Sequence, residues 1–164
     1  MPLEPRVAKI VKLMNTLDRR PESATMAQRR EASAAIARRG GFLVMPKGPE
    51  PTSQRDLSVP VQGGEITVRL YLPHGRGPAP LHVFLHGGGW CIGTLDERDP
   101  RCRMISSGAN CAVASIDYRL APENAYPTPP EDCYAALLWL VDHADELGID
   151  ASRIGISGES AGAN

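Results

Sequence analysis

The run Gly158-Glu159-Ser160-Ala161-Gly162 is the feature that most restricts how this chain can fold. A Gly-x-Ser-x-Gly pattern after a buried strand is typical of a serine held on a sharp turn between a strand and a helix. Residues 153–157 are a short apolar segment of strand type, and residues 149–152 before them are turn-like. The two glycines stand where the strand and helix backbones would come too close for a side chain. The pattern therefore predicts that Ser160 is a nucleophile.

Alternating strands and helices upstream of this turn indicate the class of fold. Strands over residues 56–61 and 65–72 flank Gln62-Gly63-Gly64, which is typical of an antiparallel hairpin. From residue 81 onward, short apolar segments alternate with helical ones, and this order predicts right-handed crossovers and a parallel sheet. We therefore expect an α/β fold with a mostly parallel sheet, crossover helices and an antiparallel start.

The individual elements of that alternation can be placed from their residues. The expected strands are 81–85, 111–116 and 153–157, and one helix is expected over 97–109. A second helix is expected to begin with Thr128 as its N-cap and to end at Gly148. Its apolar face is predicted to consist of Tyr134, Leu137, Leu138, Val141 and Ala144.

A second glycine-rich stretch, His86-Gly87-Gly88-Gly89-Trp90, follows the strand that ends at Leu85. Ligands of parallel sheets bind outside the C-terminal strand ends, so this stretch and Ser160 are expected at the same edge. A histidine followed by three glycines would occur by chance in about one chain in a thousand of this length. When an ester is attacked, its carbonyl oxygen becomes an anion that uncrowded backbone N–H groups stabilise. The stretch therefore predicts an oxyanion hole.

Four stretches together resemble the hormone-sensitive-lipase-like branch (family IV) of the α/β-hydrolases, whose members are largely carboxylesterases. They are residues 86–93, 117–123, 134–140 and 158–162. The resemblance covers residue 81 to the end of the chain and extends more loosely to the N-terminal helices. It implies an α/β-hydrolase fold and a serine carboxylic-ester hydrolase of esterase or lipase type. Such an enzyme works through an acyl-enzyme and needs no metal and no organic cofactor.

The resemblance also implies roles at the reacting centre. Ser160 matches the catalytic nucleophile. The backbone N–H groups of Gly88, Gly89 and Ala161 match the oxyanion hole. Glu159 stands where many relatives carry Asp, and we expect that difference to have little effect because it does not touch the reacting groups.

Other residues around the centre are implied to support it. His86 matches a histidine that braces the oxyanion loop through hydrogen bonds and is not the catalytic base. Trp90 and Tyr118 are candidates for the substrate pocket, with a packing role as the alternative for each. Residues 117–119 are implied to form an internal polar network that shapes the site.

The acid and the histidine of the triad follow the serine in this fold, yet residues 161–164 contain neither. His82 is expected inside a strand and His143 inside a helix, so neither has an evident route to the Ser160 hydroxyl. Loss of the histidine from a serine protease costs about a millionfold in turnover. We therefore expect the N-terminal part of a longer hydrolase, truncated after the nucleophile elbow, and a chain that is nearly inactive by itself.

The chain is expected to consist of two structural segments. Residues 1–45 would form an N-terminal helical cap or lid, with helices from Pro5 to before Pro21 and from about Thr25 to Arg39, the latter closed by Gly40-Gly41. These helices could cover the substrate entrance or merely pack on the core. Residues 54–164 would form the N-terminal half of the α/β-hydrolase catalytic domain.

Composition limits the classes of molecule that the chain is expected to bind. The formal net charge of −1, with acidic and basic residues interleaved, argues against nucleic acid or an anionic membrane as the main partner. No apolar run reaches the ~20 residues of a membrane span, and the N-terminus does not resemble a signal peptide, so a cytoplasmic location is expected. The four cysteines lack metal-ligand spacing and are expected to be buried free thiols. The expected partner is a small-molecule ester, and the oligomeric state stays open.

Two alternatives to an esterase remain from the sequence. The protein could be a non-catalytic ligand-binding protein with the α/β-hydrolase fold, as in the plant gibberellin receptors, which resemble this family and lack its catalytic histidine. The chain could also act only after it pairs with another polypeptide. Among hydrolases, cleavage of amides or lactones uses the same nucleophile and donors and stays open.

Overall fold

The computed structural model describes residues 4–17, 23–44 and 47–164. Their centre is a five-stranded sheet in the order β1-β2-β4-β3-β5. The strands are β1 (Ser53–Val61), β2 (Gly64–Leu72), β3 (Ala79–Leu85), β4 (Ala112–Asp117) and β5 (Ile149–Gly158). β2 pairs antiparallel with both β1 and β4, whereas β3 pairs parallel with both β4 and β5. The predicted antiparallel start and parallel continuation are confirmed.

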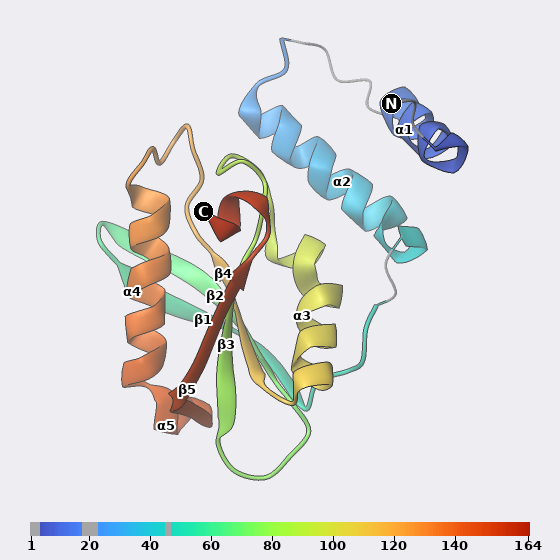
Figure 1. Ribbon diagram of the computed structural model, residues 1–164. Coiled ribbons are helices and arrows are strands. Elements are labelled where there is room, and N and C mark those ends of the chain that lie inside the picture. Colours follow the sequence, from blue (N-terminus) through green and yellow to red (C-terminus); the bar gives the residue numbers. More distant parts are fainter. Residues whose placement is uncertain (1–3, 18–22, 45–46) are drawn as a thin grey trace.

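Helices cover both faces of this sheet (Figure 1). α3 (Leu95–Ala109) lies on one face, and α4 (Thr128–Asp142) with the short α5 (Ala144–Leu147) lies on the other. The larger buried cluster joins the sheet to α4 and α5, and it includes Val68, Leu70, Val83, Ile116 and Leu140. A smaller cluster under α3 consists of Tyr71, Phe84, Cys102, Cys111 and Val113. The two glycine-rich turns follow β3 and β5, so both lie at the C-terminal edge of the parallel strands.

Two N-terminal helices, α1 (Pro5–Leu17) and α2 (Met26–Val44), lie outside the sheet and its flanking helices (Figure 1). α2 begins as predicted: Thr25 Oγ1 accepts from Gln28 N at 3.3 Å, and Thr25 N donates to Gln28 Oε1 at 2.9 Å. The predicted end at Gly40-Gly41 is wrong, because the helix continues to Val44. A glycine costs a helix only about 1 kcal/mol relative to alanine, so helical residues on both sides can carry the helix through it.

The start of α4 also differs from the prediction. Its N-cap is Pro127, so Thr128 is the first helical residue instead of the cap. The reason is a tight turn before the helix, in which Thr128 N donates to Ala125 O and Glu131 N donates to Pro127 O. α4 ends at Asp142, and the left-handed Gly148 closes α5 instead.

The predicted apolar face of the helical segment is confirmed only in part: Leu137 packs against the larger buried cluster and Ala144, in α5, belongs to it, but two other residues of that face point outward. Tyr134 and Leu138 are 63% and 46% exposed. The buried residues of the helix are Pro129, Asp132, Ala136 and Leu140. The helix turns this face to the sheet because Asp132, a charged residue that the hydrophobic pattern could not select, has its partner there.

β5 is an edge strand of the sheet in the described part of the chain. Two of its apolar side chains, Ile154 and Ile156, are 40% and 57% exposed. The described sheet therefore ends in an apolar edge. The four cysteines are free, with Cys102 and Cys111 buried. None of the helices in residues 4–17, 23–44 and 47–164 has the length and apolar character needed to cross a membrane.

Candidate active site

Ser160 lies on a tight turn between β5 and the 3-10 helix η1 (Ser160–Ala163). Its φ is +50°, a left-handed conformation that residues with side chains adopt rarely, and the residue is exposed. Glycine is required at positions 158 and 162 because other backbone atoms lie too close for a side chain. A Cβ on Gly158 would lie 2.0 Å from Gly162 O, and one on Gly162 would lie 2.2 Å from Leu85 O. Strain at an exposed serine is a feature that functional sites show often.

The glycine-rich loop after β3 touches this turn. A Cβ on Gly87 would lie 2.7 Å from Glu159 O and 3.3 Å from Ser160 Cβ. Glu159 N, in turn, donates to Leu85 O, the last residue of β3. The two turns, more than seventy positions apart in sequence, therefore meet at one place on the sheet edge.

The loop leaves backbone donors uncommitted beside Ser160. Gly88 and Gly89 have φ values of +139° and +60°, which glycine adopts at little cost. A turn forms because Cys91 N and Ile92 N both donate to Gly88 O, at 3.1 and 3.0 Å. Within the described residues, the N–H groups of Gly88, Gly89 and Ala161 donate to no acceptor. Backbone donors free in this way are what an oxyanion hole requires.

His86 is fully buried beneath this loop. Its Nδ1 is 3.0 Å from Gly87 O, and its ring stacks on Tyr118 with the ring centroids 4.2 Å apart. Tyr118 also donates to His86 O at 2.6 Å. Burial lowers the pKa of His86, because a charged imidazole would lose its hydration there. The ring thus contacts the first peptide of the glycine-rich loop and the Tyr118 ring beneath it.

No histidine of the chain hydrogen bonds to Ser160, and all four lie among the described residues. His82 Nε2 is 2.8 Å from Ser157 Oγ, and burial lowers the pKa of His82. His143 Nδ1 is 2.8 Å from Trp139 O, and His74 lies beside Thr52. The described residues thus place an exposed serine on a strained turn with uncommitted backbone donors on the adjoining loop, and none of the described histidines pairs with that serine.

Of residues 117–119, for which a polar network was expected, Tyr118 and Arg119 make side-chain hydrogen bonds. Arg119 binds Asp132 of α4 and also donates to Gln62 O at 3.0 Å. Ala121 N donates to Trp90 O at 2.9 Å, which ties the loop after β4 to the glycine-rich one. Burial raises the pKa of the Asp117 carboxyl.

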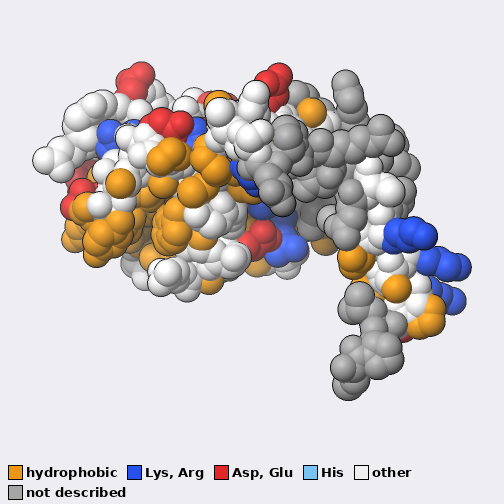
Figure 2. Space-filling view, turned by 90° about the horizontal axis from the view of Figure 1, so that it is seen from above, with side chains coloured by type: hydrophobic (Ala, Val, Ile, Leu, Met, Phe, Trp, Pro, Cys, Tyr) orange, Lys and Arg blue, Asp and Glu red, His pale blue; other side chains and the backbone are white. Residues whose placement is uncertain are grey.

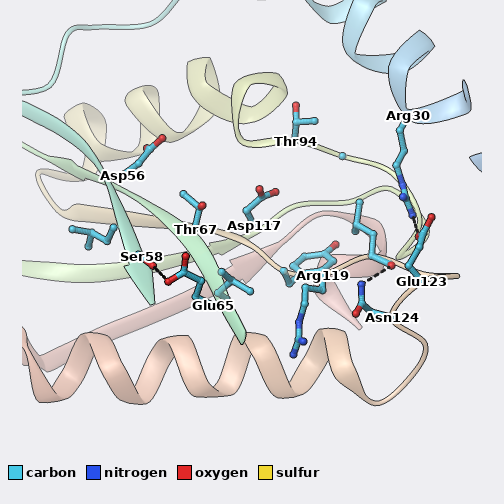
Figure 3. A pocket seen from close by; sticks show the side chains of 15 residues that line it. Arg30, Asp56, Ser58, Glu65, Thr67, Thr94, Asp117, Arg119, Glu123 and Asn124 are labelled. Atoms are coloured by element: carbon cyan, nitrogen blue, oxygen red, sulfur yellow. Dashed lines mark hydrogen bonds and ion pairs between the residues drawn. The ribbon is translucent and has the colours of Figure 1, made fainter. Parts of the chain in front are cut away.

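Cavities open around the site, among them one of about 250 Å³ that borders Gly87 and Gly88. The apolar one, of about 400 Å³, is lined by Trp90, Ala121, Tyr126, Pro129, Pro130 and Asn164. Figure 2 looks onto this edge of the sheet and shows hydrophobic side chains gathered on the part away from the N-terminal helices. The wider polar cavity, of about 780 Å³, lies between β1, β2 and the loop after β4 (Figure 3). Tyr118 borders the polar cavity but is 1% exposed, so it shapes the wall without offering surface to a ligand.

Sequence reasoning missed the contacts of Glu159. Its carboxylate lies 2.5 Å from Arg101 Nη1 and 3.2 Å from Arg98 Nε, both on α3. The residue before Ser160 is therefore tied to the helix on one face of the sheet. No local signal could have shown this, because the partners lie about sixty positions upstream.

Comparison with known proteins agrees with this geometry. A family model described as "alpha/beta hydrolase fold" matches residues 82–164, which is half of the chain. The chain belongs to the α/β-hydrolase family. The recognition from the motifs is therefore confirmed, and so is the predicted α/β-hydrolase fold.

Individual proteins similar to this chain are named as esterases or ester hydrolases. The carboxylic ester hydrolase LipN of Mycobacterium tuberculosis is 51% identical over 110 residues, which are 66% of this chain and 29% of LipN. An arylesterase of Saccharolobus solfataricus is 40% identical over 120 residues, which are 73% of this chain and 39% of that protein. Among solved structures, a hyperthermophilic esterase of Pyrobaculum calidifontis matches with a TM-score of 0.87 at 32% identity, over 99% of this chain and 51% of its own. The chain thus spans less than half of these curated relatives and about half of the solved esterase.

Proposed function

We propose that Ser160 attacks the acyl carbon of a carboxylic ester and forms an acyl-enzyme that water then hydrolyses. The observation that carries this proposal is the contact between the strained turn of Ser160 and the loop that carries the uncommitted N–H groups of Gly88 and Gly89. The carbonyl oxygen of the ester becomes negative as Ser160 adds to it. Each N–H group aimed at that oxygen contributes about 3 kcal/mol to lowering the barrier.

The proton of Ser160 needs an acceptor that the described residues do not supply, because all four histidines have other partners. We infer that the complete gene product supplies an acidic residue and then a histidine after Ser160, in the order that this fold uses. The 164-residue chain by itself should therefore hydrolyse esters at no more than a trace rate, since loss of the histidine costs about a millionfold in a serine protease.

The substrate is proposed to be an ester with a small or medium acyl group. The apolar cavity of about 400 Å³ beside Trp90 supports this, since it offers a confined hydrophobic wall next to the turn. The relatives named above are a carboxylic ester hydrolase and an arylesterase, and these names favour esters over amides or lactones.

The test is covalent labelling of the complete gene product with a fluorophosphonate, with and without Ser160→Ala. We expect labelling of the unaltered protein and none of the variant, together with Ser160-dependent hydrolysis of p-nitrophenyl acetate and butyrate. Labelling that persists in Ser160→Ala would exclude Ser160 as the nucleophile.

The second candidate is a non-catalytic ligand-binding protein with the same fold. In such a protein Ser160 would have no histidine partner, and the histidines of the described residues all have other partners. The coding sequence downstream of Asn164 separates the two candidates. An acidic residue followed by a histidine in frame supports catalysis, whereas binding of an ester analogue without turnover supports the alternative.

A further inference from the structure

Arg30 of α2 extends from the N-terminal helices to two loops at the edge of the site (Figure 3). Its Nε donates to Cys91 O at 2.7 Å. Its Nη2 donates to Ala121 O at 2.5 Å and pairs with Glu123 Oε2 at 2.6 Å. The side chain is 26% exposed, so these contacts are partly shielded from water. One residue of the N-terminal helices therefore holds both the glycine-rich loop and the loop after β4.

The contact with Cys91 continues by hydrogen bonds into the glycine turn. The Cys91 carbonyl belongs to the same peptide unit as the Ile92 N–H, which donates to Gly88 O at 3.0 Å. The Gly88 carbonyl, in turn, belongs to the same peptide unit as the Gly89 N–H. A chain of two peptide units thus leads from the guanidinium of Arg30 to the Gly89 N–H, which has no acceptor in the described chain.

A positive charge at one end of a series of hydrogen-bonded peptide units strengthens the N–H donor at the other end. A cation at a carbonyl oxygen draws electron density toward it and makes the N–H of the same peptide a stronger donor. Condensed-phase estimates put this cooperative strengthening at about 10–30% per bond. Arg30 is suited to the task because a guanidinium stays protonated and can bind two carbonyl oxygens at once.

We propose that Arg30 is a positioning residue for the oxyanion hole: it orients and polarises the peptide units that end in the Gly89 N–H. The inference rests on the esterase function proposed above and deepens it. It makes the docking of α2 a condition for full stabilisation of the oxyanion, so the N-terminal helices contribute to the chemical step without touching the substrate. A purely structural role would instead hold α2 in place and change stability or substrate affinity.

The test compares variants of the complete gene product in the hydrolysis of p-nitrophenyl butyrate. Arg30→Met keeps most of the side-chain length but removes every donor, and Arg30→Lys keeps a charge with a different geometry. Arg29→Met is the matched control, because it makes the same change one position earlier and the Nε of Arg29 donates to Ala24 O, within the N-terminal segment. Circular dichroism and thermal unfolding establish that each variant is folded.

We expect Arg30→Met to lower kcat about threefold to tenfold while KM changes less than twofold, because removal of a whole oxyanion donor costs about a hundredfold to a thousandfold. Arg30→Lys should recover part of the loss, and Arg29→Met should match the unaltered protein. The affinity for a trifluoromethyl ketone, whose adduct with Ser160 carries the oxyanion, should fall by the same factor as kcat/KM.

Each other outcome is decisive. An unchanged kcat in a folded Arg30→Met protein, or a rise in KM alone, overturns the inference and leaves the esterase intact. An equal loss in Arg29→Met also overturns it. If Arg30→Met does not fold, Arg30→Lys decides by the same criteria. Absence of Ser160-dependent hydrolysis in the unaltered protein overturns the proposed function and this inference together.

Discussion

Arg119 donates three hydrogen bonds to Asp132, from its backbone N–H, Nε and Nη2, at 3.0, 2.9 and 2.6 Å. Asp132 is 1% exposed, whereas the Arg119 side chain is 26% exposed. The pair joins the loop after β4 to α4. It also explains why α4 turns a charged residue toward the sheet.

Asp132→Asn should lower the free energy of unfolding by about 2 kcal/mol. Loss of one partner of a buried ion pair costs about 3–5 kcal/mol, and the exposed part of Arg119 moves the expectation to a lower value. Urea unfolding of the variant measures the change. Asp142→Asn, at an exposed position near the end of the same helix, is the control and should shift the midpoint little. Equal effects of the two changes would refute the role of the pair.

Gly158→Ala should prevent a native elbow, because the new Cβ would lie 2.0 Å from Gly162 O. Overpacking of this kind costs typically 1–3 kcal/mol and sometimes more, and here the crowding atom is backbone that cannot rotate away. Gly155→Ala in the same strand is the matched control, since its Cβ would come no closer than 3.4 Å to His82 Nδ1. In the complete gene product, Gly158→Ala should abolish the cooperative thermal unfolding transition of the native protein and the labelling by a fluorophosphonate. Gly155→Ala should keep both.

Stability should fall as the pH decreases from about 6.5, because burial lowers the pKa of His86 below its ordinary value. The unfolded state then binds a proton that the folded state does not, so the free energy of unfolding decreases by up to about 1.4 kcal/mol per pH unit until the folded-state pKa is reached. The Nε2 of His86 is buried without a hydrogen-bond partner among residues 4–17, 23–44 and 47–164, so a second ring proton would find no acceptor there. His82 adds a contribution of the same sign, since burial lowers its pKa as well.

His86→Asn should therefore reduce, but not remove, the pH dependence of urea unfolding between pH 6.5 and 5. The comparison uses the slope and not the absolute stability, which the substitution also changes. A slope identical to that of the unaltered protein would show that His86 stays out of this titration.

Ile156→Lys should reduce self-association of the 164-residue chain. Ile156 is 57% exposed on an edge strand, and such strands offer both apolar surface and unpaired backbone groups to another chain. Sedimentation velocity over a range of concentrations measures the effect. Met104→Lys, which introduces the same charge at a residue of α3 that is 50% exposed, should leave association unchanged. If both changes act equally, net charge and not the β5 edge controls association.

Much of the fold could be predicted because its signals are local. Gln62-Gly63-Gly64 turns the chain between two alternating strands, and the structure has the hairpin there, with Val61 opposite Gly64. Gly158 and Gly162 flank Ser160 at a spacing that suits only a crowded turn. Such patterns depend on neighbours within a few residues, so they can be recognised in the amino-acid sequence alone.

The parts that could not be predicted depend on residues that are distant in sequence. The periodicity of α4 indicated an apolar face, but Tyr134 and Leu138 are exposed because the position of Asp132 relative to Arg119 sets the rotation of the helix. The sequence around Ser160 gives no signal for the ion pairs of Glu159, because their partners lie on α3.

By itself, the sequence determined the order of strands and helices, the place of Ser160 on a tight turn and the presence of a glycine-rich loop after β3. Only the tertiary structure decided that the two turns touch, and that Arg30 reaches Cys91, sixty-one positions away, at the edge of the site. The reason is physical: turn chemistry and hydrophobic periodicity act over a few residues, whereas the partner of a charged side chain is set by where the sheet brings distant segments together.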